Sequence, residues 1–115
     1  YDDIIAKAKE INGMKVVTGR FDDLDGNALR DLADNIRSKI DTGVVVLASS
    51  FGGKASIIAM ATKSAIEKGA HCGNIVKKAA AMCGGGGGGR PDMAQAGGKQ
   101  PEKIDEMLSK IDELI

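Results

Sequence analysis

Two long apolar segments joined by a very short connection constrain the fold more than any other feature of this sequence. Residues 43–49 read GVVVLAS, and residues 54–62 read KASIIAMAT. Continuous apolar runs of this length are typical of strands that are buried on both faces of a sheet. The connection between them, residues 50–53, is too short for a crossover, so we expect the two strands to form an antiparallel hairpin.

The segment before this hairpin predicts a helical crossover. Residues 14–18 (MKVVT) are typical of a strand, and Asp25 is a favourable N-cap for a helix that follows. Apolar residues then recur with helical spacing, and we expect this helix to end in a C-cap region near Gly43. The apolar face consists of Leu29, Leu32, Ala33, Ile36 and Ile40. Strand, helix and strand in this order predict a right-handed parallel crossover.

Two further helices are expected downstream. Residues 63–73 are typical of a turn region with room for one helical turn, and residues 74–83 place their apolar side chains on one helix face. The six glycines at 84–89 must break that helix, because they lack Cβ, and we expect them to form a loop. A second irregular stretch ends at 97–98, and Pro101 suits the first position of a last helix. The apolar stripe of that helix is Ile104, Met107, Leu108, Ile111 and Ile115.

The expected fold class is therefore α/β: a small mixed β-sheet, with a parallel crossover plus an antiparallel hairpin, packed helices and a Gly-rich loop. The length of 115 residues favours one domain. Residues 1–12 are interpreted as the end of a preceding helical or linker segment, and residues 13–115 as the globular domain. Because the first residue is Tyr rather than Met, we expect the chain to be one domain of a larger protein.

The formal net charge of zero conceals an uneven distribution of charge. Residues 1–50 carry a net charge of −2 and residues 101–115 carry −3, whereas residues 51–100 carry +5. The total therefore excludes a uniformly basic nucleic-acid binder but leaves a basic middle that can attract phosphates. Ordinary solvated lysines would give the same count. No apolar run has the length that is needed to cross a bilayer.

The common phosphate-binding motifs are not present here, because the glycines and Lys99 lack the flanking elements and the spacing that these motifs require. The glycine run matches G-x-G-x-x-G trivially, but an Ala-rich helix precedes it and Pro91 follows, so a dinucleotide site is excluded. Lys99 follows a glycine without the Walker A spacing. Because Tyr1, Phe21 and Phe51 are the only aromatic residues, stacking on bases is poorly supported. We therefore expect any nucleic-acid contact to be mainly to phosphate and sugar.

The histidine and cysteines do not assemble a catalytic or zinc motif. His71 is the only histidine and has no acid–nucleophile pairing, so it is expected to cap a helix, contact phosphate or pack. Cys72 and Cys83 lack zinc spacing, and on one helix they would lie roughly 16 Å apart, too far for a disulfide. We expect two buried or half-buried thiols, which favours the reducing cytoplasm.

Three segments resemble a known family. Residues 84–99, GGGGGGRPDMAQAGGK, resemble the signature near the C-terminus of alanyl-tRNA synthetases. The similarity extends to HCGNIVK at 71–77 and to DGNALRDLAD at 25–34. It covers nearly the whole chain as the globular C-terminal domain of that enzyme, which is related to the DHH-associated domain of certain phosphoesterases.

The resemblance implies a noncatalytic tRNA-binding domain of an alanine–tRNA ligase. Such a domain grips the outer elbow of alanine tRNA and helps aminoacylation and editing act on one tRNA. The fragment would take no cofactor and would neither activate alanine nor hydrolyse mischarged tRNA, whereas the full enzyme would use ATP, Mg and Zn. Further implied partners are the other domains of the same synthetase. In the family a helical segment precedes this globular part and often mediates dimerisation, so a homodimer through that segment is also implied. Only its end, at residues 1–12, is expected in this sequence.

The candidate tRNA contacts combine the cations of the basic middle with polar groups around the glycine run. They are expected to bind phosphate, with no catalytic and no metal-ligating residues among them. The set is Lys54, His71, Asn74, Lys77, Lys78, Gly86, Gly87, Gly88, Gly89, Arg90 and Lys99.

Two alternatives remain open. The first is a substrate- or nucleic-acid-binding domain of a DHH-type phosphoesterase, in which the glycines hold a phosphate. Those enzymes usually carry a glycine-histidine pattern where this chain has Arg90, Pro91 and Asp92. The second is a protein-docking or dimerisation module that exposes the apolar stripe of the last helix.

Overall fold

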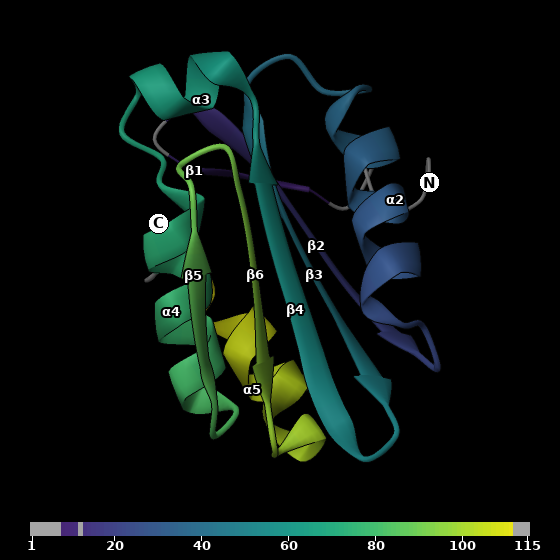
Figure 1. Cartoon of the computed structure of the whole chain (residues 1–115). Coiled ribbons are helices and arrows are strands. Elements are labelled where there is room, and N and C mark those ends of the chain that lie inside the picture. Colours follow the sequence, from purple (N-terminus) through teal and green to yellow (C-terminus); the bar gives the residue numbers. More distant parts are fainter. Residues whose placement is uncertain (1–7, 12, 112–115) are drawn as a thin grey trace.

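A single mixed β-sheet lies between two helical layers in the computed structural model, which describes residues 8–11 and 13–111 (Figure 1). The strands are β1 (Lys9–Ile11), β2 (Met14–Asp22), β3 (Gly43–Phe51), β4 (Lys54–Ala61), β5 (Gly86–Gly89) and β6 (Met93–Gly98). The helices are α2 (Gly26–Arg37), α3 (Lys63–Glu67), α4 (Cys72–Met82), the 3₁₀ turn η1 (Pro101–Lys103) and α5 (Ile104–Ser109). The strand order is β1-β2-β3-β4-β6-β5. Only β2 and β3 pair in parallel among these strands, so the expected mixed α/β class is confirmed.

The parallel crossover forms as the sequence predicts, but the predicted end of its helix is wrong. Asp25 caps α2, because its carboxylate accepts a hydrogen bond from the Ala28 N–H at 2.8 Å. The expected C-cap region near Gly43 is wrong, since α2 ends at Arg37 and Gly43 is the first residue of β3. A Cβ at Gly43 would lie 2.3 Å from the Lys15 carbonyl oxygen. Glycine is therefore needed there for the close approach of β2 and β3, not for a helix end.

The central strands supply two cores by strict alternation of their side chains. Val45 and Leu47 of β3 pack with α2 on one face, while Val44 and Val46 face α4 and α5 on the other. Strand β4 alternates in the same way, with Ile58 toward α2 and Ile57 toward α4. Period-two alternation between two apolar faces explains why both segments read as continuous apolar runs.

The glycine run is not a loop, which corrects the sequence prediction. Gly86–Gly89 form edge strand β5, and the stretch expected to be irregular up to 97–98 is strand β6. The two pair antiparallel from Gly86–Gly97 to Gly89–Ala94. Ladder hydrogen bonds use backbone groups alone, so a neighbouring strand can order glycines that have little intrinsic strand preference.

Alternate glycines of this run differ in whether the surrounding atoms leave room for a side chain. A Cβ at Gly87 would lie 2.3 Å from the Ala96 Cβ, and one at Gly89 would lie 2.7 Å from the Ala94 Cα, both on the side where α4 packs. A Cβ at Gly86 or Gly88 would meet no heavy atom within 4 Å. The fold therefore requires glycine at 87 and 89 but leaves open space at 86 and 88.

The last helix is buried on its apolar side. Ile104, Met107 and Ile111 are at most 1% exposed and belong to the core beneath α4 and the sheet. This contradicts the alternative in which the stripe is free for docking. Ile115 lies outside the described residues. Among the described residues, no helix is both long and apolar enough to span a bilayer.

Part of the N-terminal segment belongs to the sheet. Residues 1–7 and 12, over which a helical or linker segment is expected, lie outside the described residues. Lys9–Ile11 form strand β1 and pair antiparallel with the start of β2, from Lys9–Val16 to Ile11–Met14. The sheet therefore begins before residue 13.

We predict opposite effects on stability for two neighbouring glycine substitutions. Gly87→Ala should lower the free energy of unfolding by about 2 kcal/mol or more, because its Cβ overlaps Ala96. Gly88→Ala should change it by no more than about 0.5 kcal/mol, because its Cβ enters open space. Urea denaturation followed by circular dichroism measures both. Equal losses in the two variants would contradict this account of the strand.

Candidate nucleic-acid interface

Helix α4 and strand β5 are held together closely at the end of the sheet where α4 begins. The Cys72 N–H donates to the Pro91 carbonyl oxygen at 3.0 Å, which ties the start of α4 to the β5–β6 turn. A Cβ at Gly73 would lie 2.5 Å from the Gly89 carbonyl oxygen. The glycine in α4 and those in β5 therefore allow helix and strand backbones to approach each other directly.

His71 caps α4, one of the roles expected for it. Its Nδ1 atom accepts a hydrogen bond from the Asn74 N–H at 3.1 Å. This hydrogen bond explains the place of His71 at the start of the helix by structure alone.

Most of the candidate residues come together along this edge of the sheet. Asn74, Lys77 and Lys78 are exposed on α4, which packs alongside β5 (Figure 1). Arg90 follows β5 directly and has a side chain that is 72% exposed. We call this surface the glycine edge; it comprises His71, Asn74, Lys77, Lys78, Gly86, Gly87, Gly88, Gly89 and Arg90.

The backbone of β5 contributes polar groups to the glycine edge. The Arg90 N–H donates to the Met93 carbonyl oxygen at 3.0 Å, so hydrogen-bonded pairs should alternate from there along the ladder. Gly88–Gln95 and Gly86–Gly97 are then the next bonded pairs. The N–H and C=O groups of Gly87 and Gly89 accordingly point away from β6; of these, the Gly89 carbonyl lies against Gly73 of α4, and the others are left for a neighbour.

Two candidates lie elsewhere. Lys54 and Lys99 are at the opposite end of β6 from Arg90, about 20 Å away along the strand. The pairing of Ala55 with Gly98 places these two lysines next to each other on adjacent strands. The structure therefore divides the predicted contacts between the glycine edge and a second location.

The second location contains a residue that sequence reasoning set aside. Phe51 pairs with Lys54 across the β3–β4 turn and is 48% exposed, the only large hydrophobic side chain exposed in the part of the chain that the structure describes. The turn itself has Gly52 and Gly53 at φ +60° and +78°, a conformation that favours glycine. The signal in the sequence was Phe-Gly-Gly-Lys between two apolar strands, which marks a tight hairpin with an aromatic residue at its tip.

The surroundings of Arg90 are of mixed charge. Its Nε lies 3.5 Å from the Asp92 carboxylate. Both line a hollow of about 510 Å³ against the side of α2 that carries Asn27, Arg30, Asp31, Asp34 and Arg37. Acidic and basic groups alternate there, so this hollow is a poorer phosphate site than the α4 side of the glycine edge.

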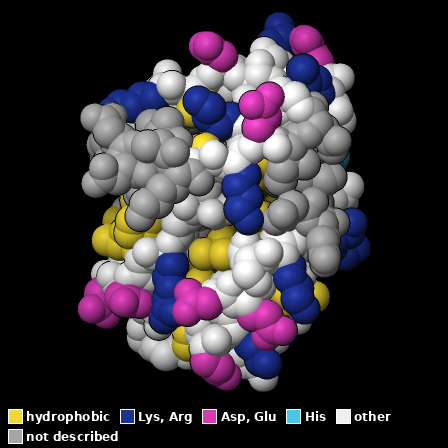
Figure 2. Space-filling view, turned by 180° about the vertical axis from the view of Figure 1, so that it is seen from behind, with side chains coloured by type: hydrophobic (Ala, Val, Ile, Leu, Met, Phe, Trp, Pro, Cys, Tyr) yellow, Lys and Arg dark blue, Asp and Glu magenta, His cyan; other side chains and the backbone are white. Residues whose placement is uncertain are grey.

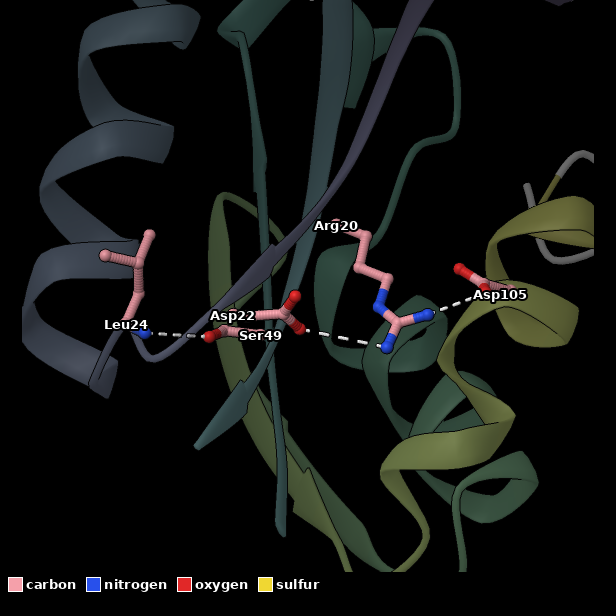
Figure 3. Close-up of polar contacts among 5 residues, drawn as sticks. All are labelled: Arg20, Asp22, Leu24, Ser49 and Asp105. Atoms are coloured by element: carbon pink, nitrogen blue, oxygen red, sulfur yellow. Dashed lines mark hydrogen bonds and ion pairs between the residues drawn. The ribbon is translucent and has the colours of Figure 1, made fainter. Parts of the chain in front are cut away.

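Arg20 is engaged within the fold and does not belong to the basic surface. Its guanidinium donates to Asp105 at 2.6 Å and lies 3.7 Å from Asp22, so it links β2 to α5 (Figure 3). The hydrogen bond with Asp105 raises the pKa of Arg20 above its ordinary value. Nearby, the Ser49 hydroxyl accepts from the Leu24 N–H at 3.1 Å and holds the turn before α2 (Figure 3).

The two thiols are buried and reduced, as the sequence predicts. Burial raises the pKa of Cys72 to about 12, and it also raises the pKa of Cys83. Both therefore remain protonated near neutral pH and are poor nucleophiles and metal ligands. Within residues 8–11 and 13–111, no three His, Cys, Asp or Glu side chains are placed to hold a metal ion.

The side of the molecule that faces away in Figure 1 carries described side chains of both charges. Figure 2 shows Lys and Arg side chains interspersed with Asp and Glu there, and several acidic side chains gather along its lower part. A polyanion would meet repulsion as well as attraction on that side.

Comparison with known proteins identifies the class. The chain belongs to the DHHA1 domain family, whose sequence model matches residues 13–115. It is 60% identical over 99% of its length to an alanine–tRNA ligase of Acetivibrio thermocellus, and 52% identical over 99% to that of Natranaerobius thermophilus. It spans about 13% of the length of these relatives.

Comparison with solved structures shows proteins that share the fold of the chain. The C-Ala domain of the alanyl-tRNA synthetase from Aquifex aeolicus superposes with a TM-score of 0.85 at 30% identity, over 94% of this chain and 96% of that one. The chain is therefore a homologue of the C-Ala domain of alanyl-tRNA synthetase. A DHH-domain protein described as a member of the s1p family of ribosomal proteins shares the fold at 15% identity, with a TM-score of 0.62 over 28% of that chain.

Removing the imidazole cap should weaken the start of α4. We expect His71→Ala to lower the free energy of unfolding by about 1 kcal/mol, because the Asn74 N–H loses its acceptor. His71→Asn supplies another capping oxygen and should recover most of that loss. Thermal and urea unfolding of the three proteins measure the effect. Equal stability of His71→Ala and wild type would show that the cap contributes nothing.

Proposed function

We propose that this chain is the tRNA-binding C-terminal domain of an alanine–tRNA ligase. In this proposal the globular domain includes strand β1 together with residues 13–115, and it holds the elbow of alanine tRNA so that aminoacylation and editing act on one tRNA. The observation that carries it is the 60% identity to such a ligase over 99% of the chain, combined with the C-Ala fold. The phosphoesterase alternative has weaker support, since the match to a DHH-domain protein is at 15% identity.

The glycine edge is the surface that we propose for the tRNA backbone. Lys77 and Lys78 stand on the exposed side of α4, and no ion pair is recorded for either among the described residues. The backbone N–H groups of β5 that point away from β6 add hydrogen-bond donors beside them. Cations and backbone donors of this kind recognise phosphate without reading sequence, which suits recognition of tRNA shape.

The chemistry of the whole ligase belongs to other parts of that protein in this proposal. Alanine activation would use ATP and Mg, and editing would use Zn. The described residues do not fit a zinc site, because both thiols are buried and no further donors gather around either. The chain's own role is to bind and position RNA. We further propose a cytoplasmic location, contacts with other domains of the same synthetase, and dimerisation through segments outside these residues.

The test is a gel-shift titration of the domain with alanine tRNA at several salt concentrations. Affinity should fall steeply as salt rises, because binding releases counterions from the phosphates. Replacing Lys77 and Lys78 together by Ala should weaken binding at 0.1 M salt by about tenfold or more and reduce the salt slope by about 1 to 2.

A matched control comes from α5. Lys110→Ala removes a cation that is already paired with Glu106 at 3.6 Å on another helix, and it should leave affinity within about twofold of wild type. Absence of tRNA binding by the wild-type domain at low salt would refute the proposed function. Equal losses in the α4 and α5 variants would refute the glycine edge as the contact.

A further inference from the structure

Among the described residues, no helix covers strands β5 and β6 on the α2 side of the sheet. Helix α2 packs chiefly on β3 and β4. Beyond them on the same side, Gln95 and Gly97 of β6 are exposed, as are the glycines of β5. A hollow of about 330 Å³ lies at this place, between the start of α2 at Gly26 and strand residues that include Ser56 and Gln95. The proposed contact uses the cations of α4 and the backbone groups at the edge of β5, whereas this surface adds the open sides of Gly86 and Gly88.

Strand alternation shows which side chains share this surface. Leu47 of β3 packs with α2, and Phe51 lies an even number of residues later, so its side chain is on the same face of the sheet. Ile58 of β4 also packs with α2, and Lys54 lies an even number of residues before it, so Lys54 is on that face as well. Register then joins the strands, since Ser56 pairs with Gly97 and Gly97 pairs with Gly86. Lys99 follows β6 directly at the same end. We call the set the open sheet face: Phe51, Lys54, Ser56, Gly86, Gly88, Gln95, Gly97 and Lys99.

Two glycines of this face, Gly86 and Gly88, have no steric reason to be glycine. Gly87 and Gly89 have no room for a side chain, whereas a Cβ at Gly86 or Gly88 would meet only open space. Neither Gly86 nor Gly88 has its φ angle in the left-handed region. Bare backbone here keeps the face flat and lets a large ligand approach the strand closely.

Phe51 supplies an aromatic ring at the rim of the same face. It stands between strands β2 and β4, with Lys54 as its hairpin partner and Lys99 one strand further along. By register Asp22 lies opposite Ser50 and is paired with Arg20, and the next residue, Asp23, donates its N–H to the Ser50 carbonyl oxygen at 2.8 Å, so both carboxylates come from the end of β2, two strands away from Lys54. An isolated exposed aromatic ring is too small an apolar patch for a protein interface, but it suits a nucleic-acid base beside phosphates.

We infer that the open sheet face is a second RNA contact, in which Phe51 stacks on an exposed base while Lys54 and Lys99 bind the adjoining phosphates. The inference rests on the proposed function and specifies that the domain contacts a nucleobase as well as the tRNA backbone. The flat glycine surface of β5 and β6 accommodates the ribose-phosphate chain next to that base.

A single tryptophan provides the direct test. The chain contains no Trp, so Phe51→Trp places one fluorophore at the hairpin tip. Addition of alanine tRNA should quench its emission and protect it from acrylamide, because the indole stacks on a base. Ser109→Trp, at an exposed position on α5, should show no response. Unchanged Phe51→Trp emission with tRNA bound overturns the inference. Emission that shifts to the blue as protein concentration rises, without RNA, marks a protein contact and also overturns it.

Affinity measurements separate stacking from simple apolar contact. Phe51→Leu should weaken tRNA binding about five- to tenfold, whereas Phe51→Tyr should remain within about twofold of wild type. Equal affinity of the Leu variant and wild type overturns the inference. Circular dichroism confirms that both variants are folded.

Two substitutions that add bulk at different places test which face of the domain contacts the RNA. Gly88→Val places methyl groups on the open sheet face and should weaken binding at least threefold without loss of stability. Ala81→Val adds similar bulk to the exposed side of α4. A loss in the α4 variant alone overturns the inference and leaves the proposed function intact. Failure of the wild-type domain to bind tRNA at all refutes the proposed function, and the inference with it.

Discussion

The structure depends on the burial of the β3–β4 hairpin on both of its faces. The side chains from Val44 to Ser49 are all buried, and they divide alternately between the α2 core and the α4–α5 core. Each apolar residue removed from water in this way contributes on the order of 1.5–3 kcal/mol. Every other element is placed by packing on this hairpin or by pairing beside it. The edge strand β5 is therefore held three strands away from β3, where its backbone meets solvent.

The contact between α4 and β5 connects the fold to the proposed function. Gly73 lies directly against the Gly89 carbonyl, and on the side where α4 packs Gly87 and Gly89 leave no room for a Cβ beside Ala96 and Ala94 of β6. That packing brings Lys77 and Lys78 beside the exposed backbone of β5. It also leaves the other side of the same strand bare at Gly86 and Gly88. One run of glycines thus serves helix packing on one face and ligand access on the other.

Local signals in the sequence identified much of this arrangement. The Asp25 cap, the helical spacing of Leu29, Ala33 and Ile36, and the apolar hairpin are short-range patterns, and all appear in the structure. The glycine run was misjudged because glycine has no side chain with which to signal a strand, and the order of β5 comes from its partner β6. Phe51 was set aside for a related reason: one aromatic residue has no meaning until its neighbours are known.

The sequence by itself determined the class of fold, the family and the basic character of the middle of the chain. These follow from apolar periodicity, a long specific string and a count of charges, which are properties of neighbouring residues. Only the tertiary structure decided which cations act together. Lys77 and Lys78 lie at the glycine edge, whereas Lys54 and Lys99 meet beside Phe51, because strand register joins residues that are far apart in the chain. Long-range pairing places charges in space, and no local pattern encodes it.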